Sequence, residues 1–180
     1  MRIIGGSLGG RIIELPKNFK SRPTTDLARE ALFNILSNRY DFESLTVLDL
    51  FSGTGSILFE FYSRGVTNIT GIEINQNHIN FIKKNISTLK IKDLNLYCTD
   101  AFKYISRAPK NYFDIVFADP PFDMKERLSI VKLIFDSNIL KTNGIVICEH
   151  APNDNYSENP YFIEVRHYGK VNFSFFKMNG

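Results

Sequence analysis

The stretch Asp49-Leu-Phe-Ser-Gly-Thr-Gly-Ser56 decides how this chain folds. An apolar, β-branched run over residues 46–50 leads into it, and a helical pattern follows it. Gly53 and Gly55 let the backbone turn tightly and approach a bound molecule, toward which the first helical amides then point. The third glycine of a dinucleotide-binding fingerprint is absent, because Leu58 stands in its place. The stretch therefore predicts a strand, a ligand-binding turn and a helix, with a plain strand-to-helix turn as the alternative.

Short apolar runs alternate with amphipathic segments along the rest of the chain. We expect strands at 46–50, 68–72, 94–98, 113–118 and 144–149, and helices at about 56–64, 76–88, 100–107 and 125–137. Continuous apolar strands that alternate with helices are typical of a parallel sheet covered on both faces. Two final runs, 161–167 and 170–177, are joined by a tight turn and predict an antiparallel edge hairpin. The pattern thus predicts an α/β fold with a mostly parallel, seven-stranded sheet.

The first 40 residues differ from the rest in both pattern and charge. Two β-prone runs that begin at Arg2 and Arg11 predict a hairpin, and a helix follows, capped by two threonines, with one apolar face made of Leu27, Ala31, Leu32, Ile35 and Leu36. Residues 1–39 carry a net charge of +4, whereas the remainder carries −1. This asymmetry predicts a nucleic-acid partner, and a solvated basic surface is the alternative. We therefore divide the chain into a basic extension, 1–40, which we expect to contact nucleic acid, and a domain, 41–180.

Other features of the sequence narrow the class of protein. No apolar run approaches the roughly 20 residues that span a bilayer, and the first residues lack the apolar stretch of a signal peptide, so we expect a cytoplasmic protein. Cys98 and Cys148 lie in apolar surroundings, which predicts buried thiols. The three histidines lack the spacing of metal ligands, and we expect no metal site.

Two acids stand at the ends of neighbouring predicted strands. Glu73 lies 20 residues after Gly53, where a carboxylate can accept both hydroxyls of a ribose. Asp100 follows the third strand, where it can accept from an adenine amino group while the amide of Ala101 faces a ring nitrogen. Each residue has a structural alternative, a helix cap for either and simple exposure for Glu73. Together with the glycine turn they predict a site for an adenosine-containing cofactor.

Asp119-Pro-Pro-Phe122 is the most specific motif in the chain. It ends the fourth strand, and ligands of open α/β sheets bind beyond the carboxyl ends of the strands. The prolines fix the turn, so that Asp119 and the Pro120 carbonyl can accept the two N–H groups of a planar exocyclic amine. Phe122 can stack on the ring that carries this amine. The alternative is a rigid turn without a chemical role.

These motifs resemble those of a known family. Asp49-Leu-Phe-Ser-Gly-Thr-Gly55, Glu73 and Asp119-Pro-Pro-Phe122 are similar to the signatures of class I S-adenosylmethionine-dependent methyltransferases that modify amino groups of nucleobases. The N-terminal motifs are similar to those of RsmD-type enzymes, which methylate guanine N2 in small-subunit ribosomal RNA and are named for guanine-966 of 16S rRNA. They are Arg2-Ile-Ile-Gly-Gly6, Arg11, Arg22-Pro-Thr-Thr-Asp26, Arg29-Glu-Ala-Leu-Phe-Asn34 and Ser63-Arg-Gly65. The resemblance runs from residue 2 to about 177.

The resemblance implies a Rossmann-like fold, S-adenosylmethionine as cofactor, and 16S ribosomal RNA or the small ribosomal subunit as partner of a monomer that needs neither metal nor membrane. It implies cofactor contacts at Asp49, Ser52, Gly53, Gly55, Glu73, Ile74, Asp100 and Ala101. The base would contact Asp119, Pro120 and Phe122. The basic block supplies the expected RNA contacts, at Arg2, Arg11, Arg22, Thr24 and Thr25.

Three other functions remain open from the sequence. An adenine-N6 or other nucleic-acid amino methyltransferase would keep the same chemistry, and the N-terminal block argues against it. An NAD-binding oxidoreductase would use the same glycine turn and Glu73, but it does not need the Asp119 motif. A non-catalytic RNA-binding assembly factor could retain the whole fold.

Overall fold

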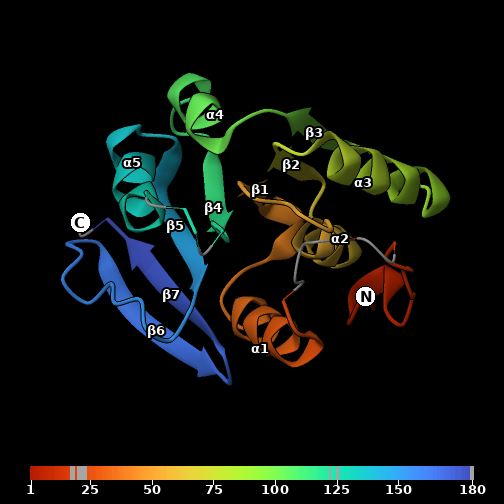
Figure 1. The fold of residues 1–180 in the computed structure, drawn as a ribbon, viewed down its shortest axis with the longest axis horizontal. Coiled ribbons are helices and arrows are strands. Elements are labelled where there is room, and N and C mark those ends of the chain that lie inside the picture. The colour runs from red at the N-terminus through yellow and green to blue at the C-terminus, as the bar shows by residue number, and fades with distance from the viewer. Residues whose placement is uncertain (17–18, 20–23, 122, 125, 179–180) are drawn as a thin grey trace.

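Seven strands among the described residues form one sheet in the order β3-β2-β1-β4-β5-β7-β6. The structure is a computed structural model, which describes residues 1–16, 19, 24–121, 123–124 and 126–178. Five strands are parallel: β1 (Thr46–Asp49), β2 (Asn68–Glu73), β3 (Leu94–Cys98), β4 (Phe113–Ala118) and β5 (Leu140–His150). The antiparallel pair at one edge is β6 (Phe162–Tyr168) and β7 (Val171–Lys177), as the sequence predicted (Figure 1).

Helices cover both faces of the sheet because successive strand residues point to opposite sides. Val47 of β1 packs into a core with α1 (Asp26–Ser37), α2 (Ser56–Ser63) and α3 (Gln76–Thr88). Its neighbour Leu48 packs on the other face with α4 (Ala101–Arg107) and α5 (Ile130–Asp136). The structure therefore confirms the predicted parallel sheet with two buried faces.

Two predicted boundaries differ from the structure by more than one residue. β5 begins at Leu140 rather than at residue 144, because Leu140 pairs with Phe113 before a register shift in the ladder. α5 begins at Ile130, after the 3-10 helix η3 (Arg127–Ser129), rather than at residue 125. Two further 3-10 helices, η1 (Gly6–Leu8) and η2 (Phe42–Ser44), occur in the N-terminal part.

The buried face of α1 differs from the predicted one. Thr25 caps the helix as expected, since its hydroxyl accepts from the Ala28 amide. Leu27, however, is 72% exposed, and the buried face consists of Ala28, Arg29, Leu32, Phe33 and Leu36. Apolar spacing alone could not find this face, because it includes a buried arginine.

The two cysteines also have different environments. Cys148 is buried in the core, as predicted, whereas Cys98 is exposed and that prediction was wrong. The physical reason is topology: β3 is an edge strand of the sheet, so it is covered less than the central strands.

The N-terminal segment folds back on itself and lies against α2. Arg2 and Ile12 form an antiparallel bridge, and the Ile3 amide donates to the Arg11 carbonyl at 2.9 Å. Gly6 has φ +74° and lies so close to Ser63 that a Cβ atom would stand 1.9 Å from the Ser63 carbonyl oxygen. The motifs at 2–6 and 63–65 therefore form one contact.

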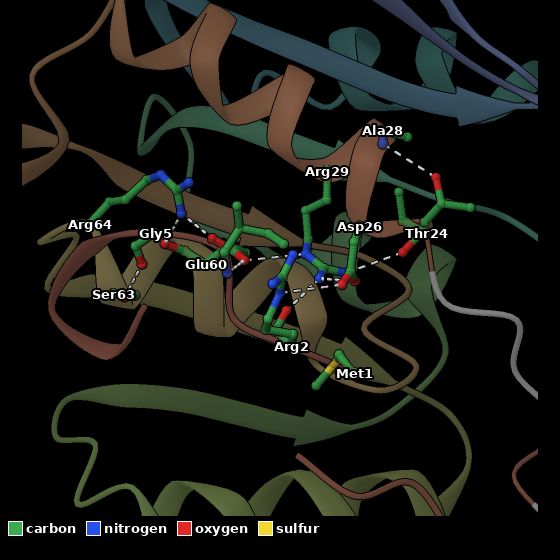
Figure 2. Close-up of polar contacts among 12 residues, drawn as sticks. Met1, Arg2, Gly5, Thr24, Asp26, Ala28, Arg29, Glu60, Ser63 and Arg64 are labelled. Carbon is green, nitrogen blue, oxygen red and sulfur yellow. Dashed lines mark hydrogen bonds and ion pairs between the residues drawn. The ribbon is translucent and has the colours of Figure 1, made fainter. Parts of the chain in front are cut away.

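Arg29 is the centre of a buried polar network that joins this segment to the domain. Its side chain is 1% exposed and donates to Glu60 Oε1 at 3.3 Å, to the Thr24 carbonyl at 3.1 Å, and to the Arg2 carbonyl. It also pairs with Asp26 at 2.7 Å. Figure 2 shows how Glu60 lies between Arg29 and Arg64. Because Glu60 is itself fully buried, both charges depend on each other.

We expect Arg29→Met to destabilise the chain by about 3 kcal/mol or more, because removal of one partner leaves Glu60 and two carbonyls short of donors in a buried site. Urea denaturation measures this change. The control is Lys132→Met, which breaks an exposed ion pair with Asp136 and should leave the midpoint nearly unchanged. Equal midpoints for the two variants would contradict the role given to Arg29.

Candidate active site

A cavity of about 970 Å³ opens at the carboxyl ends of the parallel strands. Residues from the ends of β2, β3, β4 and β5 line it, together with the turn between β6 and β7. Of the predicted site residues it brings together Thr25, Gly53, Glu73, Ile74, Asp100, Ala101, Asp119 and Pro120. The cavity is large enough for a nucleoside-sized ligand and a second planar ring.

The glycine turn between β1 and α2 has the conformation that its sequence requires. Gly53 and Gly55 both have positive φ, +50° and +77°. A Cβ atom on Gly55 would also stand 3.0 Å from the ring of Phe59, so this glycine serves the turn and its packing. Ser52 is buried, and its amide donates to the Ile72 carbonyl at 2.9 Å, which ties the turn to β2.

Glu73 is held in place at the end of β2. Its two carboxylate oxygens accept from the Gly53 amide at 2.8 Å and from the Asn75 amide at 2.7 Å. His78 Nδ1 lies 3.3 Å from the same carboxylate, outside hydrogen-bond geometry. Each oxygen keeps a second lone pair, so a fixed carboxylate at the cavity wall can still accept from ligand hydroxyls.

Asp100 begins α4 and also lines the cavity. Its side chain accepts from the Lys103 amide at 3.0 Å, so the capping role that the sequence left open is present. Ile74 lines the same cavity and is 69% exposed. An exposed apolar side chain and an acceptor in one cavity suit a planar, amino-bearing ring.

Three acids lie side by side at the ends of adjacent strands. β1 is next to β4, and β4 is next to β5, where Ala118 pairs with Cys148 and so places Asp119 beside Glu149. Burial and the charges of Glu149 and Asp49 raise the pKa of Asp119 well above its usual range. Burial likewise raises the pKa of Glu149 to about 7, against the opposing effects of Thr24 and Arg29. A charged carboxylate in this group therefore disfavours ionisation of its neighbour, as in carboxyl clusters that take part in proton transfer.

Asp49 has an oxygen without a partner. The residue is 1% exposed, its Oδ1 accepts weakly from the Phe51 amide at 3.4 Å, and its buried Oδ2 has no hydrogen bond within the described residues. Burial, reinforced by the charges of Glu73 and Glu149, raises the pKa of Asp49 to about 7. A second cavity of about 20 Å³ borders Asp49 and shares Phe51, Gly53 and Asp119 with the larger one. A buried acceptor of this kind needs a donor from a bound molecule or water.

Glu149 is a cavity residue that sequence reasoning missed. Its Oε2 accepts from the Thr24 hydroxyl at 2.6 Å, in a contact that joins β5 to the N-terminal segment. The sequence carries a signal for it, because Glu149 is the last residue of the strand predicted at 144–149, and Asp119 directly follows the strand predicted at 113–118. The turn from Tyr168 to Val171, which the sequence predicts only as a link between two strands, also lines the cavity and includes Lys170.

The predicted RNA contacts are less completely described. Arg2 and Arg11 are exposed and lie outside the two cavities. Thr24 is buried and gives its hydroxyl to Glu149, while Thr25 caps α1. Arg22, like Phe122 of the base-binding motif, falls outside the described residues. The RNA-binding roles therefore stay predictions.

Two kinds of feature are absent from the described residues. They contain no group of three or more His, Cys, Asp or Glu side chains that could hold a metal ion. None of their helices is both long and apolar enough to cross a membrane.

Solved structures share this fold. A hypothetical protein of Thermus thermophilus superposes with a TM-score of 0.87 over 99% of each chain, at 22% identity. A SAM-dependent methyltransferase from Aquifex aeolicus superposes with a TM-score of 0.62 over 80% of this chain and 87% of its own, at 15% identity. The sheet order and the cavity at its carboxyl edge define the Rossmann-like class I methyltransferase fold.

Sequence comparison gives the family. The model described as "Conserved hypothetical protein 95" matches residues 1–177. Ribosomal RNA small subunit methyltransferase D of Haemophilus influenzae is 35% identical over 154 residues, which cover 83% of this chain and 78% of that relative. The chain belongs to this family, the RsmD-type methyltransferases that the sequence motifs predicted.

The raised pKa of Asp49 predicts how stability depends on pH. Between its ordinary value of 3.8 and about 7, the folded chain binds a proton that the unfolded chain has lost, so Asp49 makes the chain less stable as pH rises through this window. Asp49→Asn removes the effect. The free energy of unfolding of the variant minus that of the unmodified chain should therefore be about 3 kcal/mol larger at pH 8 than at pH 5.

Urea denaturation at both pH values measures this difference. Glu30→Gln, on the exposed side of α1, is the control and should shift both stabilities equally. A gain from Asp49→Asn that is the same at the two pH values would contradict the raised pKa.

Proposed function

We propose that this chain transfers a methyl group from S-adenosylmethionine to the exocyclic N2 of a guanine in small-subunit ribosomal RNA, with guanine-966 of 16S rRNA as the expected target. The observation that carries the proposal is the position of Asp119 and Pro120 in the cavity that also contains Glu73 and Asp100. A named relative of the family, from Haemophilus influenzae, is a ribosomal RNA small subunit methyltransferase.

The residues of the cavity suit the proposed cofactor. Glu73 is fixed by two amides and keeps lone pairs for ribose hydroxyls. Asp100 and the exposed Ile74 line the same cavity and suit an adenine ring. The unpartnered Asp49 Oδ2 suits a donor such as an ammonium group near the glycine turn. When bound, S-adenosylmethionine supplies an electrophilic methyl group on a sulfonium sulfur.

Asp119 and Pro120 would position the amine that is methylated. The lone pair of the guanine amino group is delocalised into the ring, so this nitrogen is a weak nucleophile. Hydrogen bonds from its two N–H groups to the Asp119 carboxylate and the Pro120 carbonyl would raise its electron density and orient it. Positioning and electrostatic stabilisation of this kind supply most of the rate in such reactions.

Asp119 would also take the proton that the nitrogen loses after methylation. Burial and the nearby acids raise the pKa of Asp119 above its usual range, which makes its ionised form a stronger base than an ordinary aspartate. Its nearest acidic neighbour along the sheet edge, Glu149, is part of the cause. The proton therefore has an acceptor inside the cavity.

The basic N-terminal segment would contact RNA phosphates. Arg2 has a side chain that is 56% exposed, and Arg11 is exposed on the paired strand of the same hairpin. Exposed cations on a segment that also supplies Thr25 to the cavity wall could hold RNA next to the site.

We expect Asp119→Ala to lower methyl transfer to RNA by at least 100-fold, because the variant loses both the amine acceptor and the proton acceptor. Binding of S-adenosylhomocysteine, measured by calorimetry, should survive, because its proposed contacts lie at Glu73 and Asp100. Near-normal turnover in this variant would refute the role of Asp119. Glu30→Ala is the matched control, as it removes an exposed acid on α1.

Arg2→Ala combined with Arg11→Ala should weaken RNA binding and reduce the slope of log K against log salt by about 2, one for each lost phosphate contact. Binding titrations at several salt concentrations give the slope. The control pair is Arg107→Ala with Lys132→Ala on α4 and α5, away from the N-terminus in Figure 1. If the slope is unchanged in the Arg2→Ala and Arg11→Ala double variant, these arginines do not contact RNA phosphates.

A further inference from the structure

We propose that Glu149 recognises guanine by accepting a hydrogen bond from its N1–H, next to the amino group held by Asp119 and Pro120. This inference rests on the proposed function and names the residue that would give that function its base specificity. It concerns a side chain to which neither the family resemblance nor the comparisons give a role.

The position of Glu149 in the sheet supports this assignment. Ala118 of β4 pairs with Cys148 of β5 in parallel register, so the next residues, Asp119 and Glu149, are neighbours at the carboxyl edge. Adjacent strands lie about 4.8 Å apart. Both acids line the same cavity. Two acceptors at this spacing, on one wall, can meet adjacent groups on the edge of one ring.

One oxygen of Glu149 remains available for such a contact. Oε2 accepts from the Thr24 hydroxyl at 2.6 Å, whereas Oε1 has no hydrogen bond in the described part of the chain. The Thr24 carbonyl in turn accepts from Arg29 at 3.1 Å, so the threonine is fixed from both sides. Thr24 is thus a positioning residue, which fixes the Glu149 carboxyl through one oxygen and leaves the other without a partner among the described residues.

The chemistry of the base edge makes this contact selective. Guanine presents N1–H and the amino N–H groups as adjacent donors, and Glu149, Asp119 and the Pro120 carbonyl provide acceptors for them. Adenine and 2-aminopurine have a bare acceptor nitrogen at N1, which would face the Glu149 oxygen. A site built to accept a hydrogen bond discriminates strongly against an analogue that lacks the donor.

The test compares guanine with 2-aminopurine, which keeps the exocyclic 2-amino group but lacks N1–H. Small-subunit RNA fragments carry one or the other base at the position that the unmodified enzyme methylates, and single-turnover rates are measured. Glu149→Ala should lower the ratio of the guanine rate to the 2-aminopurine rate by about tenfold or more. Glu149→Gln keeps a carbonyl acceptor and should retain most of the ratio. Thr24→Val should lower it partly.

The outcomes separate the inference from the proposed function. If nucleoside analysis finds no N2-methylguanosine, the proposed function fails and the inference fails with it. If N2-methylguanosine forms but Glu149→Ala slows both RNAs by the same factor, the proposed function stands and Glu149 is only structural. Glu30→Ala is the control, with an unchanged ratio. Should Glu149→Ala not fold, Glu149→Leu removes the acceptor at similar volume, and an unchanged ratio there also overturns the inference.

Discussion

The buried guanidinium of Arg29 is the constraint on which the rest of this structure depends. It fixes the N-terminal segment to α2 through Glu60, and it holds the Thr24 carbonyl while the Thr24 hydroxyl holds Glu149. A buried ion pair adds little net stability compared with apolar packing, but it is favourable only when both side chains are held in a well-defined geometry. The network therefore attaches the basic N-terminal segment to the domain and, through Thr24, orders Glu149 in the cavity.

The cavity contains acceptors that are held in fixed positions and buried acids whose charges repel each other. Besides burial, the charges of Glu149 and Asp49 raise the pKa of Asp119, and the charge of Glu149 raises the pKa of Asp49. Asp49 Oδ2 has no partner among the described residues. A ligand with N–H donors lowers the free-energy cost of these buried carboxylates, whereas an anionic ligand raises it. A site with its acceptors already fixed needs little reorganisation when charge develops on a bound amine. The buried acids that make the protein alone less stable thus favour binding of the ligands that we propose.

Sequence patterns predicted the sheet, the two covered faces and most acids of the cavity, because these features depend on local periodicity and on strand ends. They failed where a residue's environment depends on distant partners. Arg29 can be buried because it pairs with Glu60. The two residues are 31 positions apart, so no local apolar pattern reveals their contact. Cys98 is exposed because β3 is an edge strand. The place of Glu149 in the cavity depends on its register beside Asp119 and on its contact with Thr24, 125 positions away.

The contact between Thr24 and Glu149 spans 125 positions of the chain. Contacts at such separation form late in folding, because the loop that they close costs more entropy than local turns do. Before β5 has left the ribosome, the N-terminal segment can contact α2 but not Glu149. The full set of cavity acceptors is thus assembled only after β5 has been made, so the competence of the site depends on residues far apart in the chain.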